Sequence, residues 1–174
     1  AIQSIERRQQ IAGLVQNVWY GLSLGSVLLL ASAGLAITFG VMGVINMAHG
    51  ELLMVGAYAT YLVQSLFRLY LPGHLDWYVP VAIPVAFFTA AAVGVVLERT
   101  VIRFLYGRSL ETLLATWGIS LILMQAVRKL FGAQNVAIEN PSWMSGGLVV
   151  SSTLVLPWSR IAIIGFAVLV LAGV

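Results

Sequence analysis

The sequence contains no cysteine and very little charge. Without cysteine there can be no disulfide, zinc-thiolate site, iron–sulfur cluster or cysteine nucleophile, so any site must use oxygen, imidazole or backbone groups. Only 9% of the 174 residues are charged, against about 25% in soluble domains, and 60% are hydrophobic. The mean hydropathy is +0.98. These values exclude a soluble fold, a nucleic-acid binder and a disordered tail.

Four stretches of the chain carry no charge and are close to, or longer than, the ~20 residues that span a bilayer. They are residues 9–50, 52–67, 77–97 and 112–127. The nine Lys and Arg residues lie along the expected helix ends, where membrane proteins normally carry them, so the net charge of +3 does not indicate a polyanionic partner. We therefore expect an all-α polytopic membrane protein.

Charges, glycines, prolines and aromatic residues divide the chain into about five transmembrane segments. They are residues 11–39, 44–69, 79–102, 111–130 and a last one from 161. The last segment has 14 residues, which cover about 21 Å of a ~30 Å hydrocarbon core, so we expect it to be incomplete. Residues 1–10 are polar and are interpreted as the end of an extramembrane region, and 11–174 as a partial transmembrane domain.

The connections between these segments differ in character. Residues 40–43 are uncharged, which predicts a sharp turn at membrane level and a broken or re-entrant region around residues 40–50. Pro80 and Pro84 are placed in the first turns of the third helix. Residues 131–160 form the longest connection and are expected to be an extramembrane loop, with a short hairpin formed by residues 148–150 and 153–155.

Asn46, His49 and Glu51 lie between two apolar segments. Ionisable groups at membrane depth are costly unless they face a cavity, a partner or a polar pathway, which favours a functional role. In the structural alternative, Glu51 stabilises the start of a helix while Asn46 and His49 bind backbone groups of the turn. Broken helices also line pathways in transporters, so both roles can coexist. A metal site is disfavoured because His49 and Glu51 supply two ligands at most.

A second group of polar residues comprises Glu98, Arg99, Arg103 and Arg108. It is denser than membrane anchoring requires, and it is either a contact surface for a soluble partner or a solvated loop. The positive-inside rule does not decide the orientation, because this loop is the most densely basic one but the opposite side carries more basic residues in total.

Three stretches resemble a known family: residues 21–58, then Glu98-Arg99 with Arg103, then WGISLILMQAVRKLFG at 117–132. They resemble the permease subunits of branched-chain amino acid ABC importers. Within that family, the forms GLAITFGVMGVINMAHGE and ATWGISLIL are similar to the urea-transporting branch.

The resemblance implies an importer of the bacterial inner membrane, built from two homologous permeases, two ATPase subunits and a periplasmic substrate-binding protein. The chain would be one multi-pass permease, truncated at both ends. It would not be an enzyme and would hold no cofactor, because the partner subunits bind and hydrolyse ATP. The family also implies a periplasmic N-terminus, which places Arg99, Arg103 and Arg108 in the cytoplasm.

We therefore expect a permease for urea, whose translocation path is partly lined by polar residues of the first two segments. These are Ser32, Thr38, Asn46, His49 and Glu51. One alternative keeps the family and changes the substrate to branched-chain amino acids or short amides. Two further alternatives are an ATP-independent channel or proton-coupled carrier with His49 and Glu51 as a relay, and a structural membrane scaffold.

Overall fold

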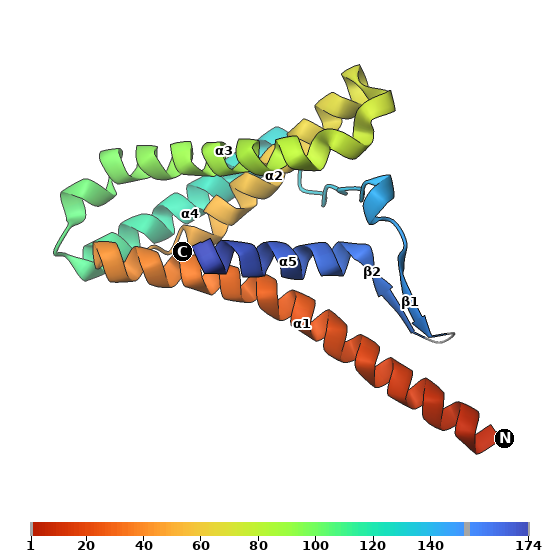
Figure 1. Cartoon of the computed structure of the whole chain (residues 1–174). Coiled ribbons are helices and arrows are strands. Elements are labelled where there is room, and N and C mark those ends of the chain that lie inside the picture. Colours follow the sequence, from red (N-terminus) through yellow and green to blue (C-terminus); the bar gives the residue numbers. More distant parts are fainter. Residues whose placement is uncertain (1, 152–153, 174) are drawn as a thin grey trace. The chain divides into compact units, whose positions relative to one another are not determined.

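The computed structural model describes residues 2–151 and 154–173 and is mostly helical (Figure 1). Its α-helices are α1 (Ile2–Met42), α2 (His49–Tyr70), α3 (Tyr78–Thr100), α4 (Ser109–Phe131) and α5 (Trp158–Gly173). Within the described residues, four helices are long and apolar enough to cross a membrane, and α5 is a shorter apolar helix. The expectation of an all-α polytopic membrane protein is confirmed.

The chain forms two compact units, which we call the central unit and the terminal unit. The central unit is Leu35–Glu139, and the terminal unit combines Ala1–Gly34 with Asn140–Val174. The end of α1 therefore belongs to the central unit and its longer first part to the terminal unit. Ala1 and Val174, which bound the two expected domains, lie outside the described residues.

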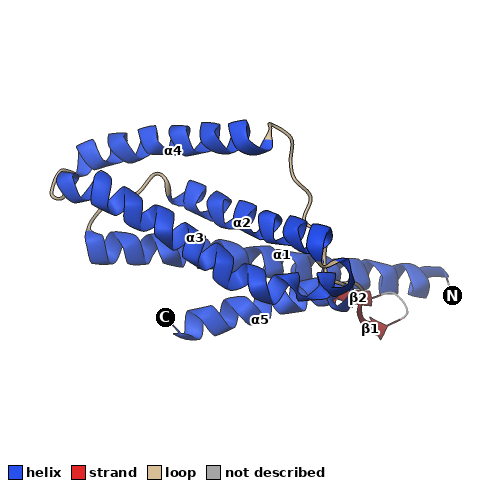
Figure 2. Ribbon diagram, turned by 90° about the horizontal axis from the view of Figure 1, so that it is seen from above, coloured by secondary structure: helices blue, strands red, loops and turns tan. Residues whose placement is uncertain are grey.

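The central unit is organised around a hairpin of two long helices. α2 and α3 lie side by side and are joined by the 3-10 helix η1 (Pro72–Trp77), as Figure 2 shows. Val63 of α2 packs on Tyr78 and Ala82 of α3, and these buried side chains form the hydrophobic core of the hairpin. A second 3-10 helix, η2 (Ile102–Leu105), then leads from α3 into α4.

The terminal unit contains the first part of α1, the 3-10 helix η3 (Ser142–Met144), a β-hairpin and α5. Strand β1 (Gly147–Ser151) pairs with β2 (Leu154–Pro157) in antiparallel register, with Leu148 opposite Leu156. The expected hairpin is therefore present, although Thr153, which was assigned to its second strand, lies outside the described residues.

Several boundaries differ from those expected from the sequence. α1 already begins at Ile2, because the polar stretch before residue 11 contains no helix breaker. Gly40 is helical, and the break between α1 and α2 falls at residues 43–48. Pro84 lies inside α3 rather than in its first turn, since that helix starts at Tyr78. α5 begins at Trp158, three residues earlier than expected.

Candidate functional site

The break between α1 and α2 is the most distinctive backbone feature of the central unit. α1 ends at Met42, and Gly43 follows with a φ of +62°, which is the left-handed region that glycine adopts at little cost. The Gly43 N–H donates to the Phe39 carbonyl at 2.8 Å, which caps the end of the helix. Non-helical backbone follows until α2 starts at His49. The broken region expected around residues 40–50 is therefore confirmed.

Asn46 organises the start of α2. Its side chain is buried, and its Oδ1 accepts a hydrogen bond from the Ala48 N–H at 3.0 Å. Its own carbonyl accepts from the His49 N–H at 3.4 Å. An asparagine that binds the backbone two residues further on forms an Asx turn, which replaces the missing helical hydrogen bonds. Asn46 therefore has the structural role that the sequence allowed for it.

A row of hydroxyl groups on α4 lies against this break. Thr112, Thr116 and Ser120 occur at intervals of four residues, which places them on one face of the helix, and all three are buried. The Thr116 Oγ1 accepts a hydrogen bond from the Met47 N–H at 3.1 Å. Thr116 thus attaches the broken segment to a helix 69 residues further along the chain.

The hydroxyl protons of the two threonines in this row are used within the protein. Thr116 lies 2.8 Å from the Thr112 carbonyl, so its hydroxyl can donate to its own helix while it accepts from Met47. The Thr112 hydroxyl lies within hydrogen-bond distance of the carbonyls of Leu105 and Arg108, at 3.0 Å and 2.9 Å. The row is therefore polar without being charged, and it fixes both the helix break and the turn before α4.

The sequence analysis missed these three hydroxyls. The signal was present in the stretch TLLATWGIS (112–120), where Thr, Thr and Ser recur at helical spacing in an otherwise apolar segment. It was overlooked because hydroxyl groups carry no charge and do not interrupt a hydrophobic stretch.

The five residues expected to line a path are not all brought together. Asn46 lies in the break, whereas His49 and Glu51 occupy the first turn of α2 and are partly buried. His49 and Glu51 are two residues apart on a helix, so their side chains point in different directions, which disfavours a direct proton relay between them. Thr38 lies in the central unit near the end of α1. Ser32 lies in the terminal unit, where its hydroxyl donates to the Leu29 carbonyl at 2.9 Å.

Glu51 also satisfies the structural alternative. It lies in the first turn of α2, where unpaired backbone N–H groups and the helix dipole favour a negative charge. Among the residues that the structure describes, no three His, Asp or Glu side chains are grouped so that they could hold a metal ion.

A buried amide is a further polar group that the sequence analysis did not single out. Gln64 of α2 is only 2% exposed, and within the described chain neither its Oε1 nor its Nε2 has a hydrogen-bond partner. Buried polar side chains are nearly always hydrogen-bonded, so an unpaired amide at membrane depth marks a position where a polar group from elsewhere is needed.

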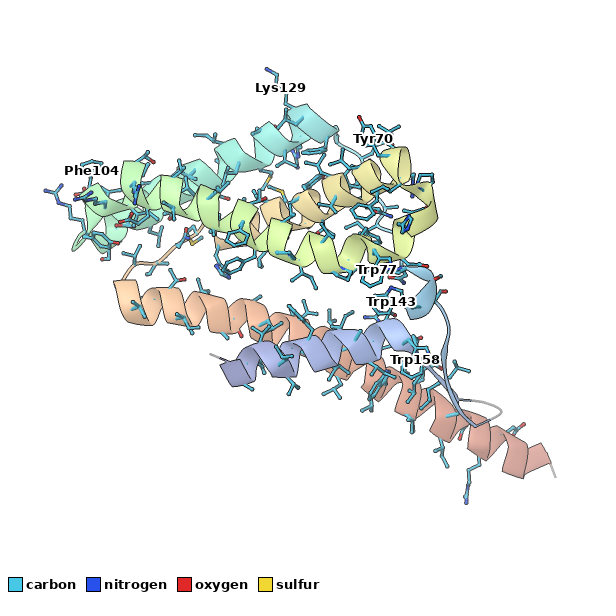
Figure 3. The ribbon with its side chains drawn as sticks, turned by 45° about the horizontal axis from the view of Figure 1, so that its top comes forward. Tyr70, Trp77, Phe104, Lys129, Trp143 and Trp158 are labelled. Carbon is cyan, nitrogen blue, oxygen red and sulfur yellow. The ribbon has the colours of Figure 1, made fainter. Side chains whose placement is uncertain are left out.

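The basic cluster lies where α3 meets α4. Glu98 and Arg99 belong to the last turn of α3, Arg103 belongs to η2, and Arg108 precedes α4. Arg108 forms an exposed ion pair with Glu111 at 3.1 Å. Arg99 and Arg103 are exposed, and so is the neighbouring Phe104, which Figure 3 shows at the tip of this end of the unit. The cluster is therefore accessible to a partner.

The opposite end of the central unit is tied together by the segment that follows α4. The Tyr78 hydroxyl donates to the Glu139 carbonyl, and the Glu139 carboxylate forms an ion pair with Arg68 at 2.9 Å. Both charged side chains are more than half exposed, so this ion pair contributes less than about 1 kcal/mol. Tyr78 is buried, and its hydrogen bond is the stronger attachment of the two.

Comparison with known proteins assigns the chain to a family. Residues 17–174 match the family described as "Branched-chain amino acid transport system / permease component". The chain belongs to this permease family. No solved structure matches it.

Curated relatives agree with this assignment. The chain is 30% identical over 147 residues to the high-affinity branched-chain amino acid transport system permease protein LivH of Salmonella typhimurium, covering 83% of this chain and 47% of the relative. It is 31% identical over 144 residues to LivH of Escherichia coli, covering 82% of this chain and 46% of the relative. It is 27% identical over 169 residues to BraD of Pseudomonas aeruginosa, covering 94% of this chain and 54% of the relative.

The chain spans about half the length of the curated relatives it matches.

Membership of the permease family decides two expectations from the sequence, on enzymatic activity and on location. Those relatives are transport permeases and not enzymes, so the expectation that this chain is not an enzyme is confirmed. Together with the apolar helices, the family makes this a multi-pass inner-membrane protein.

Proposed function

We propose that the protein is a membrane-spanning permease component of an ATP-driven importer and that the central unit forms part of its translocation path. The observation that carries the proposal is the helix break at residues 43–48, held by the hydroxyl of Thr116 inside a chain of this permease family. A break in a membrane helix exposes backbone groups at membrane depth, and transporters use such breaks to line polar pathways.

The proposed path combines the residues expected from the sequence with those found in the structure. Ser32, Thr38, Asn46, His49 and Glu51 remain the proposed lining residues, and we add Gln64 and the α4 hydroxyls of Thr112, Thr116 and Ser120. Apart from Glu51 and the titratable His49, these groups are neutral donors and acceptors. Such groups can exchange hydrogen bonds with a small polar solute without holding it tightly.

The partners follow from the family. We propose a second homologous permease subunit, two ATPase subunits that bind ATP, and a periplasmic substrate-binding protein. Glu98, Arg99, Arg103 and Arg108 would contact a cytoplasmic partner, since the exposed end of the central unit carries both charge and the apolar ring of Phe104. This arrangement requires a periplasmic N-terminus. Residues 1–10 would then be the end of a periplasmic region, and residues 11–174 part of the transmembrane domain.

Two substrates are proposed. The names of the relatives favour branched-chain amino acids, because all of those compared transport this class. Urea is favoured by the resemblance of residues 34–51 and 115–123 to the urea-transporting branch, and by the mainly uncharged character of the proposed path. A zwitterionic amino acid would gain from paired charges, of which His49 and Glu51 could supply only a part.

The test is uptake by the complete transporter in sealed vesicles. Labelled leucine and labelled urea are offered separately, each with the other compound as unlabelled competitor, and an ATPase subunit without its nucleotide-binding lysine serves as control. Leucine uptake that requires ATP would support the amino-acid importer, and ATP-dependent urea uptake that ignores leucine would support the urea importer. Entry of either solute without ATP would contradict the proposal and indicate a channel.

The role of the carboxylate is tested in the same vesicles with Glu51→Gln, which keeps the size of the side chain. If Glu51 lines the path, uptake falls while the amount of assembled transporter stays the same. Unchanged uptake would remove the carboxylate from the proposed path and leave Glu51 with its structural role at the start of α2.

A further inference from the structure

Arg160 of the terminal unit is in contact with side chains of α1. It lies in the first turn of α5 and is partly buried, and its guanidinium carbon lies 5.2 Å from the centroid of the Tyr20 ring. Its Nη1 donates to the Ser23 hydroxyl at 3.4 Å, and Ser23 is fully buried. In the described part of the chain Arg160 forms no ion pair with a carboxylate. A partly buried guanidinium that has only neutral partners is favourably placed to bind an anion.

Trp19 of α1 supplies a second donor in the terminal unit. The Nε1 of Trp19 is buried, and no acceptor for it is found among the described residues. Trp19 lies one helical turn before Ser23, so both residues are on the same face of α1. Arg160 and this face of α1 therefore offer a guanidinium and an indole N–H, and among the described residues the acceptor facing them is the neutral Ser23 hydroxyl, which receives the Arg160 bond. An oxyanion would satisfy both donors, and hydrogen bonds from charged donors to an oxyanion are among the strongest in proteins.

An apolar groove begins directly beside these donors. It has a volume of about 420 Å³ and lies between α1 and α5 of the terminal unit. Gly21, Gly25 and Leu29 line it on α1, and Ile164, Val168 and Leu171 on α5. A Cβ atom added to Gly21 or Gly25 would meet nothing within 4 Å, so the missing side chains leave this space open. The groove starts one residue after Tyr20 and one helical turn after Arg160.

The depth of these features in a bilayer follows from helix lengths. The apolar span Gln10–Val41 has 32 residues and is about 48 Å long, whereas the hydrocarbon core is about 30 Å thick. The span is therefore longer than the core, and the aromatic pair Trp19 and Tyr20, close to the polar N-terminal stretch, indicates that its N-terminal end extends beyond the hydrocarbon. Trp19 and Tyr20 then lie at the level of the lipid headgroups, where aromatic residues are enriched, and the groove extends from there into the hydrocarbon.

We propose that the terminal unit binds one phospholipid, with its phosphate on Arg160 and Trp19 and an acyl chain in the groove between α1 and α5. A phospholipid carries an oxyanion and a hydrocarbon chain in one molecule, which matches the order of the two features along the helices. A soluble oxyanion would leave the groove empty. A transmembrane helix would fill the groove but would satisfy the two donors only if it also carried an acidic side chain at the headgroup level.

The experiment counts phosphatidylglycerol on the complete transporter. The complex is purified in a mild detergent, washed, supplied with phosphatidylglycerol and analysed by native mass spectrometry. Arg160→Gln removes the charge, and Gly25→Leu fills the groove. Matched controls are Lys129→Gln, an exposed basic residue of the other unit, and Gly13→Leu, a glycine of α1 outside the groove. Circular dichroism and size-exclusion chromatography confirm that each variant folds and assembles.

We expect the unsubstituted complex to retain one phosphatidylglycerol that both test variants lose and both controls keep. Near a membrane surface one basic residue strengthens lipid binding by about fivefold, so Arg160→Gln should weaken retention by at least that factor. Equal retention in all variants would overturn the proposal. Loss in Arg160→Gln alone, or displacement of the lipid by inorganic phosphate or leucine, would indicate a soluble oxyanion instead. Dissociation of the subunits in Gly25→Leu would show that the groove holds a protein helix.

Discussion

At the scale of single residues, the helix break depends on one glycine, one asparagine and one threonine. Gly43 supplies the backbone conformation, Asn46 replaces hydrogen bonds that the interrupted helix loses, and Thr116 attaches the break to α4. Each residue acts through a different physical effect: conformational freedom, local hydrogen bonding and long-range hydrogen bonding. They can therefore be tested separately.

Thr116→Val removes the acceptor of the Met47 N–H and leaves this donor unpaired. Because an intramolecular hydrogen bond contributes about 0.5–1.5 kcal/mol, we expect the complete permease to lose about this much stability in chemical unfolding. Thr116→Ser keeps the hydroxyl and should recover most of the loss. Thr100→Val is the matched control, since Thr100 is exposed and its hydroxyl donates to the Val96 carbonyl of its own helix. An equal loss in both valine variants would contradict the role of Thr116.

Gly43→Ala places a side chain at a φ of +62°. No atom lies within 4 Å of the added Cβ, so the expected loss of about 1–2 kcal/mol comes from backbone conformation alone. Gly40→Ala provides the comparison, because Gly40 is helical and an added Cβ there also meets nothing within 4 Å. Its replacement should be neutral or stabilise by up to about 1 kcal/mol. Thermal unfolding of both variants is the measurement. A larger loss of stability in Gly40→Ala than in Gly43→Ala would contradict this explanation.

At the scale of elements, the sequence predicted the helices better than the contacts between them. The absence of charge located four membrane-spanning segments, and residues 40–50 were correctly expected to interrupt the first helix. The exact position of the break at 43–48 depends on the left-handed backbone of Gly43 and the side-chain bond of Asn46, and the lack of charge in this segment does not specify either. The hydrogen bond between the Met47 N–H and Thr116 could not be predicted, because one sequence does not show which helix packs against the break.

The attachment of the segment after α4 to the α2–α3 hairpin gives a prediction for this element. Tyr78→Phe removes the hydroxyl that binds the Glu139 carbonyl, so amide protons in residues 132–139 should exchange several times faster in hydrogen-exchange mass spectrometry. Tyr70→Phe is the control, because Tyr70 is 72% exposed and lies at the same end of the unit. Equal exchange in Tyr78→Phe and the unchanged protein would show that the Tyr78 bond does not order the segment.

At the scale of the whole molecule, the orientation in the membrane is open to a direct test. The chain has no cysteine, so a single introduced cysteine reports its own position. We expect Gln134→Cys to react with a membrane-impermeant maleimide added outside intact spheroplasts, and Arg103→Cys to react only after lysis. Both positions are exposed in the central unit, so accessibility in the folded chain is comparable. The reverse pattern would place the N-terminus in the cytoplasm and the basic cluster outside.

Thr116 follows Met47 by 69 positions, so the two partners of this hydrogen bond are synthesised at different times. Ribosomes add about 5–20 residues per second, so the α1–α2 break is synthesised roughly 3–14 seconds before the threonine that fastens it. During this interval the local bonds of Gly43 and Asn46 are already available, whereas the contact with α4 is not. When the first two helices enter the membrane, the break between them is therefore defined by local hydrogen bonds alone. The hydrogen bond from Met47 to Thr116 forms only after α4 has been synthesised.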